Sequence, residues 1–299
     1  MFIEMKKILF IVLAICVVNT AFSQGLKFGF KTGLTISKFT GPSEEINGME
    51  LESNSTTGGF MVGALLGYGF TDLSGIKVEL LYNQKGTQFN YTGSGFQRLP
   101  TETGSTVLVT GDQRIDLNVS TGYLDIPIMA YGRLGRFEFE GGVSLNLLLS
   151  GAGNGEVEID GVTAAGASTG IFNGVLDHRY GRDDISGRIP FIEEDLVALN
   201  IDGQIINIPK ILNAYYLFSD NPESLSSDRV YNFLDVGLVG GINYYWNSTL
   251  YIGARLNYGL LDVTNDESGY DISRISPANG VQFDKDRNFS IQLSLGFSL

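Results

Sequence analysis

Cysteine is almost absent from this sequence. The one cysteine, Cys16, lies in an N-terminal segment that we expect to be removed on export. The remaining chain therefore has no thiol for a disulfide, a thiolate metal site or a cysteine nucleophile.

Basic residues are scarce as well. The chain has 20 Lys and Arg against 33 Asp and Glu. Removing residues 1–23 takes away Glu4, Lys6 and Lys7, which leaves 18 basic and 32 acidic residues. Nucleic-acid binding needs a basic surface, so this balance argues against it.

Long apolar runs are missing after the first 23 residues, which excludes a helical membrane protein. Residues 1–23 resemble a secretory signal peptide, with Lys6 and Lys7 before an apolar run from Ile8 to Val18 and a small-x-small site at Ala21-Phe22-Ser23. A lipoprotein signal at Cys16 is the weaker alternative, because bulky Ile15 occupies a position that favours a small residue.

Strict alternation of apolar and polar residues dominates the rest of the chain. In the last twelve residues, positions from Phe289 to Leu299 alternate with Ser290, Gln292 and other small or polar residues. Such a period of two predicts a strand with one apolar face. The pattern occurs eight times, in residues 26–37, 60–70, 76–84, 123–131, 136–150, 231–246, 250–261 and 288–299.

The connections between these segments alternate between short and long. Turns at 71–74, 132–135 and 247–249 are separated by connections at 38–58, 88–118, 151–229 and 262–287. Outer-membrane barrels have short periplasmic turns and long outer loops. We therefore predict an all-β fold for residues 24–299, an eight-stranded antiparallel up-and-down transmembrane β-barrel in the outer membrane. A ten-stranded barrel that uses part of 151–229 is the alternative.

The third long connection, 151–229, is expected to form a small extracellular cap. Asp160-Gly161, Asn173-Gly174 and Asp202-Gly203 are turn dipeptides, and the last predicts a hairpin of 197–201 with 204–208. A short helix is expected from Pro209 to Phe218.

The segment around residues 115–131 shows two irregularities. Apolar residues change from odd to even positions, so we expect a bulge near Thr121-Gly122. Pro127 cannot donate a ladder hydrogen bond, which predicts a local break.

Charged residues occupy the face opposite the apolar one. An eight-stranded barrel is just wide enough for side chains to fill it, so these charges are expected to pair with each other inside. A sealed interior is favoured over a polar conduit or proton path. The predicted interior charge network comprises Lys27, Lys31, Lys77, Glu79, Lys85, Asp125, Glu138, Glu140, Asp235 and Arg255.

Aromatic residues gather at the strand ends next to the short turns. This distribution favours an interfacial girdle over ordinary core packing. The residues expected in the periplasmic girdle are Tyr68, Phe70, Phe137, Phe139, Tyr244, Trp246 and Phe297.

Catalytic and metal sites have little support. His178 follows Asp177 and could belong to a hydrolase triad, but a lone histidine beside Arg179 is more often a solvated loop residue. Acidic clusters at 193–195 and 262–271 lack the spacing of an EF-hand calcium site. We expect a chain that is not an enzyme and has no cofactor.

Residues 28–37, 123–128 and 255–260 form three motifs, and together these resemble the PorT-type family of outer-membrane β-barrel proteins. Residues 28–37, FGFKTGLTIS, resemble its first strand, and residues 255–260, RLNYGL, resemble its penultimate strand. Residues 123–128, YLDIPI, are similar to its Tyr-Leu-Glu-Ile-Pro-Leu motif, with Asp125 in place of Glu. The unusually long third connection is a second departure. The resemblance implies an eight-stranded barrel, and some members of the family are tied to protein secretion.

The expected role is surface interaction, envelope integrity or assisted protein secretion. Expected partners are outer-membrane lipid, lipopolysaccharide, the barrel-assembly machinery and a secretion-system or surface protein. The alternatives are a narrow, porin-like diffusion pore, a surface hydrolase, and a soluble periplasmic barrel with an apolar interior.

Overall fold

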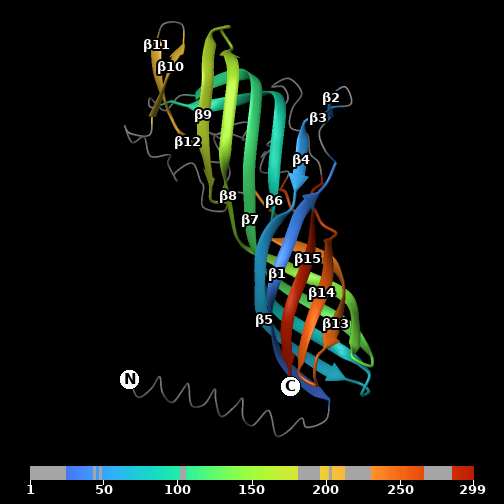
Figure 1. Ribbon diagram of the computed structural model, residues 1–299. Coiled ribbons are helices and arrows are strands. Elements are labelled where there is room, and N and C mark those ends of the chain that lie inside the picture. Colours follow the sequence, from blue (N-terminus) through green and yellow to red (C-terminus); the bar gives the residue numbers. More distant parts are fainter. Residues whose placement is uncertain are drawn as a thin grey trace, which may run out of the picture.

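Eight strands of the computed structural model form a closed ring (Figure 1). The model describes residues 25–42, 45–46, 49–101, 106–180, 196–201, 204–212, 230–265 and 285–299. The strands of the ring are β1 (Leu26–Thr40), β5 (Thr57–Gly69), β6 (Ser74–Pro100), β7 (Thr106–Leu134), β8 (Phe137–Thr163), β13 (Leu234–Tyr245), β14 (Leu250–Gly259) and β15 (Arg287–Ser298).

The last strand closes the ring against the first. β15 pairs antiparallel with β14 on one side and with β1 on the other, where Phe297 lies opposite Phe30 and Leu293 opposite Leu34. Leu299 extends the closure, because its N–H donates to the Phe28 carbonyl at 2.8 Å. A closed ring leaves no strand edge in the membrane. The predicted eight-stranded antiparallel barrel with long extracellular loops is confirmed.

The two faces of the barrel strands differ sharply in polarity. Outward residues such as Phe30, Leu34 and Leu145 are exposed, as a surface in contact with lipid requires. Lysines, glutamates and asparagines alternate with them and are buried in the lumen. A soluble barrel with an apolar interior is therefore wrong for this chain.

Three of the strands are far longer than a membrane requires. β6, β7 and β8 have 27, 29 and 27 residues, whereas about 9–11 span the membrane. Their remaining residues extend roughly 50 Å farther at about 3.3 Å per residue. Much of the predicted outer connections is thus strand rather than loop.

The projecting parts of these strands form an extracellular sheet, here called the extension (Figure 1). β9 (Ser168–His178) pairs with β8, and β4 (Glu52–Ser55) pairs with β6. β12 (Ile211–Leu212) runs parallel to β9. β10 (Leu196–Ile201) and β11 (Gln204–Pro209) form a hairpin, and β2 (Glu45–Ile46) and β3 (Met49–Glu50) form a second, very short one.

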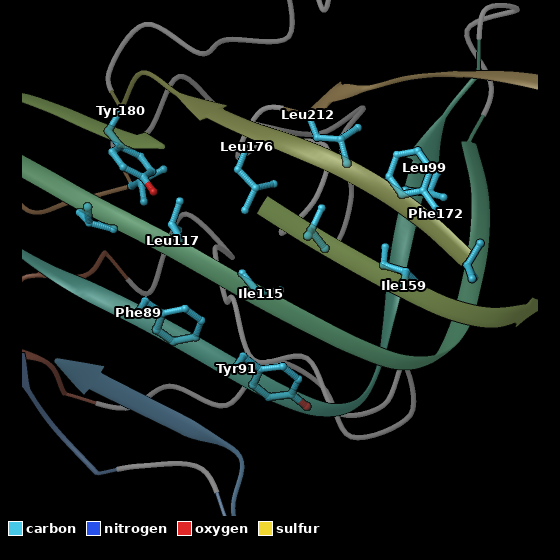
Figure 2. Close-up of a cluster of buried hydrophobic side chains, with 14 of the residues drawn as sticks. Phe89, Tyr91, Leu99, Ile115, Leu117, Ile159, Phe172, Leu176, Tyr180 and Leu212 are labelled. Carbon is cyan, nitrogen blue, oxygen red and sulfur yellow. The ribbon is translucent and has the colours of Figure 1, made fainter. Parts of the chain in front are cut away.

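The polarity of the faces inverts where the barrel becomes the extension. On β7 the residues on the lumen side include Asp125 in the barrel, but Leu117 and Ile115 in the extension. The outward residues change in the opposite sense, from Ile128 to Asp116. The apolar inner face packs into a separate core with residues of β9, β10, β11 and β12, part of which Figure 2 shows. The outward faces of the same strands thus contact lipid in the barrel and water in the extension.

This inversion explains the irregularity predicted near Thr121-Gly122. The register of β7 against β8 shifts between Gly122 and Tyr123, and Leu149 of β8 is the extra residue. The bulge lies where it was expected, but on the neighbouring strand. The odd-numbered side chains of β7 point inward in both the barrel and the extension. The apolar residues occupy outward positions where the strand faces lipid and inward positions where it faces water.

Pro127 breaks the sheet locally as predicted. It lies opposite Ser144 of β8, but the ladder between β6 and β7 lacks pairs at Glu79 and Leu80. Proline has no N–H to donate on that side.

Two expectations for the third connection are wrong. Asp160-Gly161 and Asn173-Gly174 lie within β8 and β9 rather than in turns, because both dipeptides pair in the ladder between these strands. The chain turns between residues 163 and 168 instead, where Gly166 has φ +83°. Pro209 ends β11, and Ile211 and Leu212 pair with β9 instead of starting a helix; residues 213–218 lie outside the described residues.

The hairpin predicted for this connection is present as β10–β11, and its turn residues Asp202 and Gly203 lie outside the described residues. The expected signal peptide, residues 1–23, also lies outside them. Within the described residues, no helix has the length and apolar character needed to cross a membrane.

We predict that deletion of Phe297–Leu299 prevents assembly of the barrel. The deletion removes the pairs of β15 with Gly29 and Phe30 and the hydrogen bond from Leu299, so the ring cannot close at its periplasmic end. The measurement is heat-modifiable migration on gels of outer-membrane fractions. Leu299→Phe is the control and should assemble like the unaltered chain; normal migration of the deletion would contradict the prediction.

Candidate functional site

The lumen of the barrel holds a chain of alternating charges. Its centre is Arg255 on β14, which alternation directs inward. The Arg255 guanidinium binds both carboxylate oxygens of Glu79 on β6, at 2.7 and 2.8 Å, and also Glu140 on β8 at 2.5 Å. Lys31 on β1 approaches Glu79 at 3.4 Å. All four side chains are almost wholly buried.

The chain of charges continues toward the periplasmic end. Lys77 lies between Glu140 and Glu138, at 2.6 and 2.5 Å. Arg133 Nε donates to the second oxygen of Glu138 at 2.7 Å. Each carboxylate in this series therefore contacts two cations, which compensates for its removal from water.

A second polar group lies toward the outer mouth. Lys85 binds Asp125 at 2.9 Å, and Asn83 donates to the other oxygen of Asp125 at 2.8 Å. Asp235 accepts hydrogen bonds from the amides of Asn146 and Asn288, at 3.3 and 3.2 Å. Asp125 thus pairs with one cation and one amide, whereas the hydrogen bonds to Asp235 come from amides, which carry no net charge.

Nine of the ten charged residues expected in the lumen are buried there. The tenth, Lys27, is half-buried at the periplasmic end, with its ammonium 5.5 Å from the centre of the Tyr131 ring. Arg133 was not expected in the lumen, because the sequence pattern placed residues 132–135 in a turn. Continuing the odd positions of β7 past Tyr131 would have placed Arg133 inside.

Tyrosines close the periplasmic end of the lumen. Tyr245 and Tyr251 lie with ring centres 5.1 Å apart, and Arg133 lies 4.1 Å from the Tyr245 ring. A Cβ on Gly296 would lie 2.0 Å from the Tyr251 ring, so glycine is required there for the ring to cross the lumen. The cavity among these residues is about 10 Å³, room for about one water molecule.

Aromatic rings also cover the outer mouth. Tyr180 packs edge-on against Tyr231 with ring centres 4.7 Å apart, and Tyr231 lies 6.0 Å from Phe39 of β1. All three rings belong to the core of the extension. Ion pairs fill the lumen between this cover and the periplasmic tyrosines.

The aromatic residues expected in the girdle lie on the outer surface near the short turns. Six of them are exposed: Tyr68, Phe70, Phe137, Phe139, Trp246 and Phe297. Tyr244 is half-buried and packs on Phe137, with ring centres 5.2 Å apart.

The carboxylate of Asp177 does not face the imidazole of His178, its neighbour in the sequence. It lies in the core of the extension at the end of β9, where its Nδ1 and the Tyr180 hydroxyl are 3.1 Å apart. Asp177 points to the opposite, exposed face because side chains alternate along a strand. Asp177 and His178 therefore do not form half of a hydrolase triad. The expectation of a solvated loop histidine is also wrong, since His178 is buried.

The outer face of the extension is polar and hollowed. A hollow of about 500 Å³ is lined by Arg114, Asp116, Glu156, Glu158, Asn173 and Lys210, together with Val157, Gly174 and Val175. Arg114 lies opposite Glu158, but Asp116 lies opposite Glu156 and Asp112 opposite Asp160. Like charges in directly opposed positions destabilise a sheet, so strand pairing alone does not account for this face.

The two acidic clusters lie mostly outside the described residues. Residues 193–195 and 266–271 belong to segments that are not described. Asp262 is described, and its Oδ1 accepts hydrogen bonds from the N–H and hydroxyl of Thr264. In the described part of the chain, no three Asp, Glu, His or Cys side chains are arranged to hold a metal ion.

We predict that Arg255→Gln strongly destabilises the barrel. Glu79 and Glu140 would lose their shared guanidinium, and breaking a buried ion pair from one side costs about 3–5 kcal/mol. Urea titration of the protein in vesicles measures the free energy of unfolding. Arg114→Gln on the exposed face is the matched control, with an expected change within about 0.5 kcal/mol. Equal stability of the two variants would contradict a central role for Arg255.

We further predict that the extension loosens in mild acid. Burial lowers the pKa of His178 to about 3, whereas its ordinary value is about 6.5. Below about pH 6.5 the unfolded segment takes up a proton at His178 and the folded one does not, so stability falls as the pH drops from 6.5 toward 3. Hydrogen exchange of β9 amides at about pH 7 and about pH 5, corrected for intrinsic rates, measures this change. His178→Asn should reduce the dependence; an unchanged dependence would show that other groups cause it.

Comparison with known proteins identifies the family. The family model described as "Outer membrane protein beta-barrel domain" matches residues 22–265. Among solved structures, the chain is similar to Ail of Yersinia pestis, with 9% identity over 92% of this chain and 99% of that chain and a TM-score of 0.33. It is also similar to OprG of Pseudomonas aeruginosa (11% identity, 92% and 96% covered, TM-score 0.32) and to Neisserial surface protein A (8% identity, 90% and 96% covered, TM-score 0.32).

A comparison with curated proteins gives no match. The family match covers most of the sequence and agrees with the closed ring of strands, so the chain belongs to the outer membrane protein β-barrel domain family and resides in the outer membrane.

Proposed function

We propose that this chain is a non-enzymatic surface-interaction protein whose barrel anchors and seals while its extension binds a partner outside the cell. The observation that carries the proposal is the continuation of β6, β7 and β8 into a sheet with its own apolar core. A barrel needs no such core for its own closure. A rigid sheet held well above the membrane is suited to presenting a binding surface.

The outer face of the extension is the proposed contact surface. Its hollow has both signs of charge, with Arg114 and Lys210 near Asp116, Glu156 and Glu158. These groups are on strands rather than on loops, so their positions are fixed before binding, which lowers the entropic cost of association. A polar partner that itself carries both signs of charge fits this surface best.

A narrow diffusion pore is the weaker alternative. The lumen carries buried ion pairs along its length, and the periplasmic cavity has room for about one water molecule. Reproducible conductance steps from the purified protein in a planar bilayer would contradict a sealed anchor.

We also propose that the chain belongs to the PorT type within its family. The motif at residues 123–128 supports this assignment, because Asp125 anchors Lys85 and Pro127 breaks the ladder with β6. For a protein of this type the proposed partner is a secretion component, and lipopolysaccharide is the alternative.

Photo-crosslinking in native membranes tests the surface role. A crosslinking residue placed at Glu158 or Asn173, in the hollow, should capture the same discrete partner from both positions. The matched control is Thr71 in a periplasmic turn, which should not capture it. Recovery of a secretion component would favour assisted secretion, and lipopolysaccharide alone would favour an envelope role. Equal capture from Thr71, or none from the hollow, would contradict the proposal.

A further inference from the structure

A second hollow lies at the opposite end of the molecule, on the periplasmic rim. Its volume is about 310 Å³. Arg133 at the end of β7 and Tyr245 at the end of β13 line it, together with Gly135 and Arg136 of the turn after β7 and Trp246, Asn247 and Ser248 of the turn after β13. Arg133 and Tyr245 also belong to the periplasmic end of the lumen, whereas the turn residues take part in neither the lumen network nor the extension.

Local hydrogen bonds hold the two turns together. The Tyr245 N–H donates to the Arg136 carbonyl at 2.8 Å, and the Arg136 guanidinium donates to the Tyr244 hydroxyl at 3.3 Å. Gly135 has φ +61°, a left-handed conformation that glycine adopts without strain, and it permits the two-residue turn. The hollow is therefore formed by fixed elements.

The charge of the hollow is positive in a strongly acidic chain. Arg133 has a carboxylate partner in Glu138, which it binds at 2.7 Å and which Lys77 also contacts. Arg136 is exposed, and its guanidinium donates to the neutral hydroxyl of Tyr244. None of the described residues that line the hollow is acidic. About one positive charge thus remains without a carboxylate partner.

The surface around the hollow belongs to the membrane boundary. Trp246 is 68% exposed and Leu134 75% exposed, and the Phe137–Tyr244 ring pair lies on the membrane side. Tryptophan and tyrosine favour the level of lipid headgroups. A ligand seated here would have its charge at the arginines and its apolar part along the outer wall of the barrel.

We propose that this rim hollow binds the phosphodiester headgroup of an anionic phospholipid from the inner leaflet. One phosphodiester carries one negative charge, which matches the single uncompensated arginine. The guanidinium of Arg136 offers paired N–H donors to phosphate oxygens, and the acyl chains lie over Phe137 and Tyr244. This site is independent of the surface role proposed for the extension.

Trp246 makes the site directly measurable, because it is the only tryptophan in the chain. The full chain is placed in phosphatidylcholine bilayers that contain phosphatidylglycerol, and bromine is introduced on the acyl chains of one lipid at a time. Brominated phosphatidylglycerol should quench Trp246 fluorescence more efficiently than brominated phosphatidylcholine. The expected preference is about fivefold, because one basic residue near an anionic membrane surface contributes about 1 kcal/mol.

Arg136→Gln should abolish this preference while leaving the barrel folded, since Arg136 lies outside the lumen network. Arg114→Gln, on the extension, is the matched control and should keep the preference. Equal quenching by the two lipids, or an unchanged preference in Arg136→Gln, would overturn the proposal. Loss of the preference when inorganic phosphate is added would show that the site takes free phosphate, which also overturns a lipid site.

Discussion

The constraint that governs this structure is that no backbone N–H or C=O may remain unpaired in hydrocarbon. The pairing of β15 with β1 satisfies it by removing both edges of the sheet. Eight strands then enclose a space only wide enough for side chains. Alternation places every second residue in that space, and many of these inward residues are polar or charged. Closure of the ring buries the charged residues of the lumen. Their ion pairs offset the free-energy cost of removing these charges from water.

The same strands meet a second solvent above the membrane, and this explains the rest of the fold. On β6, β7 and β8 the outward face becomes polar at the outer boundary, while the inner face becomes apolar. A sheet with that pattern must cover its apolar face, and the β10–β11 hairpin, β12 and the aromatic residues at the barrel mouth do so. The membrane anchor and the extracellular sheet are therefore formed by the same strands, but their polar and apolar faces are exchanged. The extra residue at Leu149 lies at this transition.

The barrel could be predicted from the sequence because its two rules are local. A period of two identifies each strand, and the alternation of short and long connections orients them. The interior charges followed from parity alone, which is why Arg133 was missed: the predicted strand ended at residue 131, three residues before the end of β7. The extension was harder. Asp160-Gly161 and Asn173-Gly174 have turn chemistry, but pairing with neighbouring strands keeps both dipeptides extended. Which residues of the outer connections face each other depends on strands distant in sequence, and no local pattern encodes it.

The charges of the lumen are paired with each other, whereas some charges at the two ends of the molecule are not. This difference favours binding at the ends. In the lumen each of Glu79, Glu138 and Glu140 contacts two cations, so little attraction is left for a passing solute. On the extension, like charges oppose each other at Asp116 and Glu156, which leaves an unbalanced field in water. At the periplasmic rim, Arg136 provides a positive charge at the level of lipid headgroups. The charges that remain available to other molecules therefore lie at the two ends of the protein, and ion pairs occupy the lumen that separates them.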